Sequence, residues 1–273
     1  MGTQSEKATT FRALHDGPGA FILPNPWDVG TAKMLAHLGF KALATTSAGH
    51  AFSLGRADNT LGRDLTLAHA REIVGATDLP VSADLGNCFA DAPETVAETI
   101  RLAASTGLAG ASVEDATGRA DDPVYELELA VDRVRAAADA AHGLPFPFTL
   151  TARAENFLVG RQDLFDTIQR LQAYQDAGAD VLYAPGLTTR DEIASIVRAL
   201  DRPVNVLVGL KGFALTLADL SALGVRRVST GSALSRAALG AFLRAARELS
   251  DHGTFGFNHE AAQSSEVAGM LGQ

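Results

Sequence analysis

The segment Pro80–Asp91, PVSADLGNCFAD, decides how the rest of the sequence is read. It opens with a short apolar run that contains the β-branched Val81, and the run stops at the carboxylate of Asp84. A run of this kind predicts a buried strand that ends in a loop. Because burying a carboxylate without partners is costly, the acid at the end of this strand indicates a polar site rather than a packing position.

Similar strands alternate with helical patterns along almost the whole chain. Asp163–Gly178, for example, has apolar residues at the 3.6-residue spacing of a helix. Eight such strand–helix units in about 250 residues predict an α/β protein of the (β/α)₈ TIM-barrel type. A doubly wound open sheet is the alternative, but no GxGxxG motif follows the first strand. The predicted strands are Ala20–Pro24, Ala42–Ser47, Pro80–Asp84, Ala111–Asp115, Phe148–Arg153, Asp180–Ala184, Val204–Val208 and Arg227–Thr230.

The bulk properties narrow the class of protein. We predict one barrel domain over residues 1–273, with residues 254–273 as a C-terminal tail or helix. The net charge of −9 argues against nucleic acid and anionic membranes as partners. A single cysteine suits a reducing compartment, and no apolar run reaches the roughly 18 residues that a bilayer span needs. We therefore expect a cytoplasmic protein that acts on a small molecule.

Three consecutive predicted strands end in charged residues. Asp84 ends the third strand, Glu114 lies at the end of the fourth, and Arg153 ends the fifth. The carboxyl ends of barrel strands form one mouth, so these side chains are expected to converge. Two carboxylates with water are how proteins usually hold Mg²⁺, and an arginine fork suits a substrate carboxylate or phosphonate. Asp115 and Glu155 fit ion-pair or capping roles equally well.

Seven short segments, taken in order, resemble the isocitrate lyase/phosphoenolpyruvate mutase superfamily. The resemblance implies a barrel that assembles as a homotetramer, a dimer of dimers, with its last helices exchanged between subunits. It also implies a Mg²⁺-dependent reaction, with Mn²⁺ as the alternative ion, that passes through a pyruvate-like enolate. The segments are NPWD (Asn25–Asp28), TTSAGHAFSLGRAD (Thr45–Asp58), SADL (Ser82–Leu85), GASVEDATG (Gly110–Gly118), LTARAENFLVGR (Leu150–Arg161), RLQAYQDAGADVLYAPGL (Arg170–Leu187) and PVNVL (Pro203–Leu207).

The same resemblance assigns roles to individual residues. Asp84 and Glu114 would hold the metal, with Glu114 acting through water. Asp58 matches a loop aspartate that performs nucleophilic or proton-transfer work, and Arg153 would clamp the distal acid group of the substrate. The implied catalytic residues are therefore Asp58, Glu114 and Arg153, and the implied substrate-binding residues are Trp27, Thr46, Ser47, Ala48, Arg153 and Asn205. Trp27 equally fits a packed aromatic residue.

Two departures from the superfamily pattern affect the function. After Asp84 the pattern reads D-x-[DE]-x-G-[YF], but this chain has Gly86 and Cys88 at the second acid and the glycine. Either the affinity for Mg²⁺ is then expected to fall, or Asp115 or Glu155 compensates for the lost carboxylate. The gating loop Thr117–Tyr125, TGRADDPVY, lacks the K-[KR]-C-G motif of isocitrate lyases. Cys88 is either a substitute proton donor or a small buried residue.

These features predict a Mg²⁺-dependent lyase that forms or cleaves a C–C bond next to a 2-oxo acid. The substrate would be a small 2-oxo or 2-hydroxy acid. P–C bond chemistry on phosphonopyruvate, by a mutase or a hydrolase, is the first alternative and rests mainly on Asp58. A barrel that binds a 2-oxo acid without catalysis is the second, motivated by Gly86 and the altered gating loop.

Overall fold

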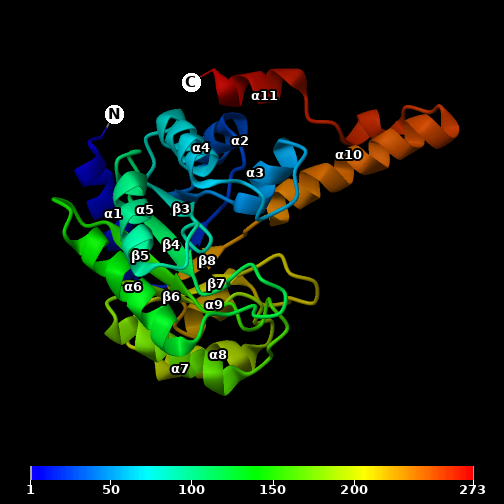
Figure 1. The fold of residues 1–273 in the computed structure, drawn as a ribbon. Helices are drawn as coiled ribbons and strands as arrows, with labels where there is room; N and C mark the ends of the chain where they lie inside the picture. The colour runs from blue at the N-terminus through cyan, green and yellow to red at the C-terminus, as the bar shows by residue number, and fades with distance from the viewer. Residues whose placement is uncertain (1, 273) are drawn as a thin grey trace.

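The computed structural model describes residues 2–272 and confirms the barrel (Figure 1). Eight parallel strands form one sheet in the order β1-β8-β7-β6-β5-β4-β3-β2. At the seam between the two edge strands the Ala44 N–H donates to the Pro24 carbonyl at 3.0 Å, so the barrel is nearly closed. The strands are β1 (Phe21–Leu23), β2 (Leu43–Ala44), β3 (Val81–Asp84), β4 (Gly110–Glu114), β5 (Thr149–Arg153), β6 (Val181–Tyr183), β7 (Val204–Leu207) and β8 (Arg227–Ser229).

Each strand overlaps its predicted range, and helices on the outside of the barrel connect them. The main core lies between this helical layer and the outer face of the strands, and it is rich in alanine, leucine, valine and isoleucine. The helices are α1 (Gln4–Asp16), α2 (Val29–His37), α3 (Ser47–Ser53), α4 (Arg63–Ala76), α5 (Pro93–Ala104), α6 (Leu127–His142), α7 (Leu164–Asp176), α8 (Arg190–Ala199), α9 (Leu217–Ala222), α10 (Ala233–His252), the 3₁₀ helix η1 (Gly256–Glu260) and α11 (Ser264–Leu271).

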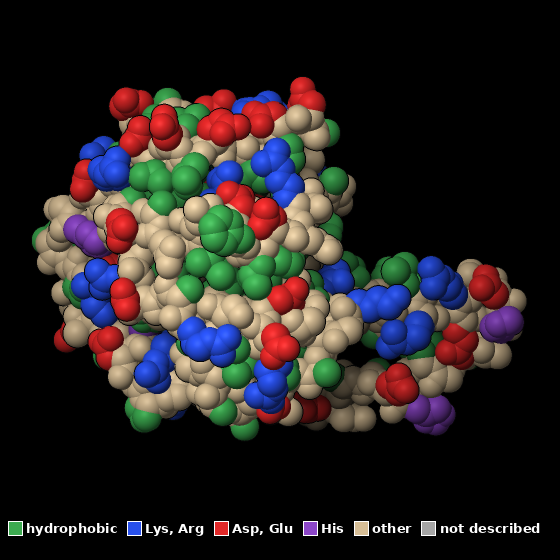
Figure 2. All heavy atoms as spheres, turned by 90° about the horizontal axis from the view of Figure 1, so that it is seen from below, with side chains coloured by type: hydrophobic (Ala, Val, Ile, Leu, Met, Phe, Trp, Pro, Cys, Tyr) green, Lys and Arg blue, Asp and Glu red, His purple; other side chains and the backbone are tan. Residues whose placement is uncertain are grey.

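Helix α10 and the 3₁₀ helix η1 form an arm that stands clear of the barrel (Figure 2). Helix α10 is strongly amphipathic, yet Ser235 is its one buried residue. Beyond η1 the chain returns to the barrel, where α11 packs on α2 of the same chain. No helix within residues 2–272 combines the length and apolar character needed to cross a membrane.

The amino ends of the strands are covered by α1, and His15 of this helix is buried there. Its ring packs edge-on against Phe11 and Phe21, at centroid distances of 5.0 and 5.1 Å. Its Nδ1 lies 2.9 Å from the Phe11 carbonyl, and its Nε2 lies 3.4 Å from the guanidinium of the buried Arg227. Burial, reinforced by the charge of Arg227, lowers the pKa of His15 to about 3.

Because His15 is buried in its neutral form, we expect the free energy of unfolding to fall in mild acid. The unfolded chain takes up a proton near pH 6.5, whereas folded His15 stays neutral down to a pKa of about 3. Stability from this group is therefore complete above pH 6.5 and falls as the pH drops, by about 2 kcal/mol between pH 7 and pH 5. The free energy of unfolding of His15→Gln, measured with urea, should therefore depend less steeply on pH than that of the wild type. The exposed His37→Gln is the control, and an equal slope in His15→Gln and wild type would contradict the prediction.

Candidate active site

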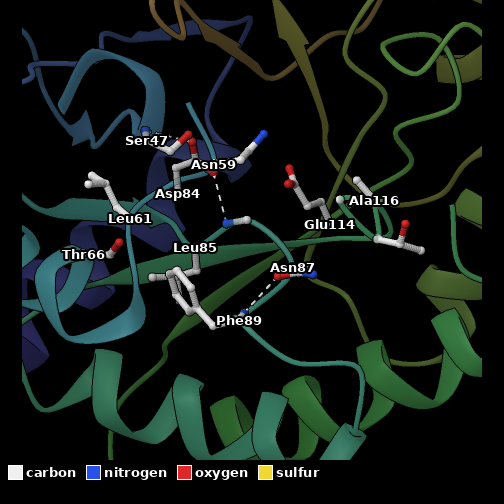
Figure 3. A pocket seen from close by; sticks show the side chains of 13 residues that line it. Ser47, Asn59, Leu61, Thr66, Asp84, Leu85, Asn87, Phe89, Glu114 and Ala116 are labelled. Carbon is white, nitrogen blue, oxygen red and sulfur yellow. Dashed lines mark hydrogen bonds between the residues drawn. The ribbon is translucent and has the colours of Figure 1, made fainter. Parts of the chain in front are cut away.

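Asp84 and Glu114 meet at the carboxyl ends of two neighbouring strands, as the sequence predicts. Strands β3 and β4 pair in register, with Asp84 opposite Ser112. Both carboxylates line one pocket of about 190 Å³ beside the barrel mouth (Figure 3). Ser47 is the third predicted residue in its lining, which also contains Asn59, Leu61, Thr66, Leu85, Gly86, Asn87, Phe89, Ala116, Thr117 and Gly118.

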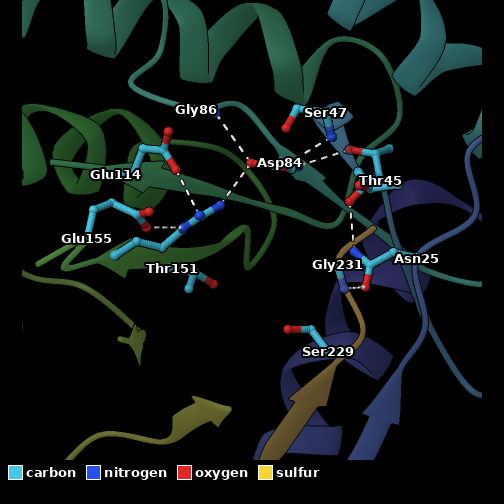
Figure 4. Close-up of polar contacts among 12 residues, drawn as sticks. Asn25, Thr45, Ser47, Asp84, Gly86, Glu114, Thr151, Glu155, Ser229 and Gly231 are labelled. Carbon is cyan, nitrogen blue, oxygen red and sulfur yellow. Dashed lines mark hydrogen bonds and ion pairs between the residues drawn. The ribbon is translucent and has the colours of Figure 1, made fainter. Parts of the chain in front are cut away.

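Arg153 lies between three carboxylates rather than in open space, and Figure 4 labels these carboxylates as Asp84, Glu114 and Glu155. Its Nη1 pairs with Asp84 Oδ1 at 3.0 Å, its Nη2 with Glu114 Oε2 at 2.9 Å, and its Nε with Glu155 Oε1 at 2.8 Å. The guanidinium also lies 5.0 Å from the ring centroid of Tyr183. In this structure the fork predicted for a substrate acid group is thus engaged by three acids of the protein itself. For Glu155 the sequence left several roles open, and in the structure this residue is an ion-pair partner of Arg153.

The charges of this cluster do not balance, because three carboxylates surround one guanidinium. Burial raises the pKa of Glu114 well above its usual range, against the opposing charge of Arg153. Burial likewise raises the pKa of Glu155. The cluster therefore disfavours full ionisation of its acids, and a cation bound beside them would stabilise their ionised forms.

A hydrogen-bond network fixes the backbone and carboxylate of Asp84. The Asp84 N–H donates to the Thr45 hydroxyl at 2.9 Å, and Asp84 Oδ2 accepts from the Ser47 N–H at 3.1 Å. Thr45 is held by Asn25, whose Nδ2 donates to the Thr45 carbonyl at 2.8 Å while its Oδ1 accepts from the Gly231 N–H at 2.9 Å. Asn25 and Thr45 are site-building residues to which the sequence prediction assigned no role, although both lie at predicted strand ends.

The remaining predicted residues are spread around the mouth. Asn205 is buried inside the barrel, where it bonds Ser229 and Arg227 at 2.9 Å each, and it lines a smaller polar cavity with Asp84 and Arg153. Thr46 is buried and caps α3 through the Gly49 N–H.

Four predicted site residues are absent from the linings of both cavities: Trp27, Thr46, Ala48 and Asp58. Trp27 is half-buried, and a Cβ added at Gly49 would lie 3.1 Å from its Cβ, so its backbone packs closely on α3. Asp58 lies on an exposed loop beside the lining residue Asn59. Partial withdrawal from water, assisted by the charge of Asp84, raises the pKa of Asp58.

Cys88 does not face the pocket, which corrects the suggestion that its thiol transfers protons there. The residue is fully buried in the hydrophobic core, and burial raises the pKa of the thiol to about 12. Its φ of +57° lies in the left-handed region, and the residue is absent from the linings of both cavities. The alternative reading, a small buried residue, is the one that the structure supports.

The loop that contains Cys88 is held by the buried Arg133. Its Nη2 donates to the Asn87 carbonyl at 2.7 Å, and its Nη1 donates to the carbonyls of Ala90 and Asp91. The guanidinium lies 4.1 Å from the ring centroid of Tyr125, so it also stacks on an aromatic face. These contacts fix the wall of the pocket that follows β3.

The donor set fits a magnesium ion held mainly by water and substrate. Glu114 Oε1 faces Gly86, where an added Cβ would lie 3.5 Å away, and this oxygen is separate from the one that pairs with Arg153. Within residues 2–272 no three histidine, cysteine or acidic side chains are grouped so as to hold an ion together. One or two carboxylates are what Mg²⁺ usually takes from a protein, so Asp84 and Glu114 suffice.

The segment in place of a gating loop is a small closed hairpin. Ala116 and Val124 form an antiparallel bridge across it. Arg119 pairs with Asp91 at 3.1 Å and with Asp122 at 3.0 Å, which ties the hairpin to the loop after β3. Thr117 and Gly118 of this hairpin line the pocket but supply no acid, lysine or thiol.

A parallel barrel with charged groups at the carboxyl ends of its strands defines a TIM-barrel enzyme. The family model of phosphoenolpyruvate phosphomutase matches residues 11–250, and the chain belongs to this family. It is an enzyme of the isocitrate lyase/phosphoenolpyruvate mutase superfamily, whose members are lyases and mutases that act on 2-oxo acids.

Three known proteins illustrate the similarity. A crystal structure from Burkholderia cenocepacia J2315, of a protein assigned by inference as a lyase or mutase, has a sequence 61% identical to this chain. Its TM-score is 0.97, over 99% of this chain and 97% of that one. An uncharacterized protein of Mycobacterium tuberculosis is 35% identical over 89% of each chain. The structure of an oxaloacetate acetylhydrolase with its product oxalate is 26% identical, with a TM-score of 0.87 over 100% of this chain and 96% of that one.

Proposed function

We propose that this chain is a Mg²⁺-dependent lyase that forms or cleaves a C–C bond next to a 2-oxo acid through a pyruvate-like enolate. The observation that carries the proposal is the shared pocket of Asp84 and Glu114, with an unpaired carboxylate oxygen of Glu114 facing it. The oxalate bound by the related acetylhydrolase is a planar dianion that mimics such an enolate. Mn²⁺ is the alternative ion.

Each residue contributes a defined part of this chemistry. Asp84 and Glu114 would hold Mg²⁺, which supplies positive charge where negative charge develops on the enolate oxygen. Ser47 keeps Asp84 in place through its N–H and offers its hydroxyl to the pocket. Arg153 fixes the carboxylates relative to one another, and its charge would attract a substrate acid group into the inner cavity that it lines. Asp58, with its raised pKa, would exchange a proton at the reacting carbon.

Calorimetric titration with oxalate tests the proposal. We expect micromolar binding in the presence of Mg²⁺ and loss of binding with a chelator, because the two carboxylates repel the dianion when no cation is present. Binding that is indifferent to the metal would contradict the proposed enolate site.

P–C bond chemistry on phosphonopyruvate is the second candidate. It is favoured by the family match and by the position of Asp58 beside the pocket lining. Phosphorus NMR separates the two candidates, because a hydrolase would release phosphate and a mutase would produce a new phosphorus resonance from phosphonopyruvate. A lyase of the leading type would leave that resonance unchanged.

We further propose that the arm pairs with a second copy in a homotetramer, with helix exchange. The face of α10 that carries Leu239, Phe242, Leu243 and Leu249 is 40–66% exposed at these residues. An amphipathic helix without a partner on its apolar face is unusual for an isolated chain, because burial of that face is its main source of stability.

The substitution Phe242→Asp is expected to reduce the oligomer, because it places a charge at the centre of the α10 apolar face. Phe242 is 66% exposed in the single chain, so the variant should fold but assemble poorly. Light scattering after gel filtration measures the mass. The similarly exposed Phe165→Asp on α7, at 71%, is the control. Equal masses for wild type and Phe242→Asp would rule out this interface.

A further inference from the structure

Arg227, the first residue of β8, is a buried cation without an acidic partner. The residue is 4% exposed, and it forms no ion pair with a carboxylate of residues 2–272. Its Nε donates to Asn205 Oδ1 and its Nη2 to Thr151 Oγ1, each at 2.9 Å, and its Nη1 lies 3.4 Å from His15 Nε2. A guanidinium has five N–H groups, so two of them find no acceptor in the described part of the chain.

The histidine beside Arg227 does not balance this charge. His15 Nδ1 lies 2.9 Å from the Phe11 carbonyl, so the ring proton belongs on Nδ1 and Nε2 is left as an acceptor for the guanidinium. All three partners of Arg227 are therefore neutral. Burial lowers the pKa of Arg227 to about 10, and the charge of Arg153 acts in the same direction. A charge withdrawn from water in this way is costly unless an opposite charge accompanies it.

Other arginines withdrawn from water in this protein have partners that Arg227 lacks. Arg170 pairs with Asp115, and Arg153 pairs with three acids. Arg133 donates to three backbone carbonyls and lies over the ring of Tyr125. Within residues 2–272 Arg227 has neither an acid, a backbone carbonyl nor an aromatic face as a partner.

The inner cavity, of about 60 Å³, adjoins this guanidinium. Arg227, Arg153 and Asp84 all line it, and Asp84 is the one acid among its lining residues. Because Asp84 pairs with Arg153 at 3.0 Å, the charge of Arg227 is left in excess. Ser82 and Ser112 also line the cavity at 4% and 9% exposure, and neither hydroxyl has a hydrogen-bond partner within residues 2–272. The cavity therefore offers one uncompensated positive charge and free hydroxyl donors.

The size of the cavity restricts what can bind there. One water needs roughly 15 Å³, so the space admits a halide ion accompanied by water. A phosphate or sulfate ion has five heavy atoms and two negative charges, which exceed both the room and the single charge in excess. Water alone would supply dipoles but no negative charge to balance the guanidinium.

We propose that the inner cavity is a binding site for one small monovalent anionic group, with Arg227 as its cation. A halide ion such as chloride is the occupant in the free protein, and the acid group of a substrate has the same chemistry. Glu114 and Glu155 pair with Arg153 and are absent from the lining, so Arg227 is the guanidinium left for an anion. The site itself does not depend on the proposed function.

Thermal melting of the full chain in sodium chloride and in sodium gluconate of equal ionic strength tests the site. Gluconate has the same charge but is too large for the cavity. Chloride alone should raise Tm, by about 2–4 °C for each tenfold increase above its dissociation constant. Arg227→Met should remove the difference between the salts. Ser112→Val keeps the guanidinium but fills part of the cavity and should reduce the difference, whereas the exposed Arg202→Met should preserve it.

Anomalous diffraction from crystals grown in sodium bromide locates the ion. We expect a bromide peak beside the Arg227 guanidinium in the wild type and none in Arg227→Met. Repeating the experiment with oxalate and Mg²⁺ identifies the natural occupant. A bromide that stays is an independent ligand, whereas a displaced bromide means that a substrate acid group takes the same place.

The outcomes separate this inference from the proposed function. An empty or water-filled cavity in bromide, or an equal response to chloride and gluconate, overturns the anion site even if oxalate binds with Mg²⁺. A salt difference that both Arg227→Met and Ser112→Val retain overturns it as well, and Ser112→Val alone decides if Arg227→Met does not fold. Failure of oxalate to bind counts against the enolate site alone.

Discussion

Replacing Asp84 with asparagine is expected to abolish Mg²⁺-dependent oxalate binding and to lower turnover by at least about 100-fold. Asparagine has nearly the same shape and can still accept the hydrogen bond from the Ser47 N–H, which spans 3.1 Å in the wild type. It lacks the charge that a hard divalent cation requires. Calorimetry with and without a chelator measures the loss of oxalate binding. Product formation from the 2-oxo or 2-hydroxy acid substrate measures the loss of turnover.

The control for this substitution is Asp121→Asn, an exposed aspartate in the hairpin near the pocket. It changes the net charge by the same amount without touching the carboxylate cluster. Both variants should melt close to the wild type, so that a loss in Asp84→Asn is attributable to the site. Retention of metal-dependent binding in Asp84→Asn would remove Asp84 from the metal site.

The second large effect is expected from Arg153→Met, which should lower the free energy of unfolding by about 3–5 kcal/mol. Methionine fills much of the same volume but leaves three carboxylates facing one another. Their side chains are 20%, 12% and 5% exposed for Asp84, Glu114 and Glu155, so water does little to screen them. Chemical denaturation at pH 7 measures the loss.

Arg12→Met provides the matched comparison. Arg12 pairs with Asp180 at 3.0 Å, the same distance as Arg153 to Asp84, but its side chain is 42% exposed. Exposed pairs contribute about 0–1 kcal/mol, so this variant should lose little stability. If Arg153→Met lost no more than Arg12→Met, the cluster would not be a buried network.

The barrel and the convergence of Asp84, Glu114 and Arg153 could be predicted from the sequence, because strand ends in a parallel barrel share one mouth. The contacts of Arg153 could not be predicted, because the direction of its guanidinium depends on three carboxylates from separate strands and loops. Local spacing also placed Cys88 on the catalytic face. The structure instead places Cys88 in the hydrophobic core, with a left-handed backbone that no sequence rule assigns to cysteine.

The apolar residues that line the pocket could likewise not be predicted from the sequence. Leu61 and Phe89 lie on different loops, and neither belongs to a periodic pattern that would mark it as a contact. Phe89 stands at the aromatic position of the superfamily pattern, but that pattern does not indicate which way its ring points. Contacts between loops arise from the packing of distant segments, and periodicity carries no information about them.

The seam of the barrel has a consequence for how the molecule breathes. Strand β2 contributes two residues, and Ala44 bonds Pro24 where the sheet closes between β1 and β2. Just above, the side chain of Asn25 reaches the Thr45 carbonyl on one side and the Thr230 and Gly231 amides on the other. The Asn25 side chain therefore reinforces the junction of β1 and β2, where the backbone forms few hydrogen bonds. Transient opening of the cylinder would begin at this seam, next to the Thr45 hydroxyl that accepts from the Asp84 N–H, so closure of the barrel and the position of Asp84 depend on the same amide.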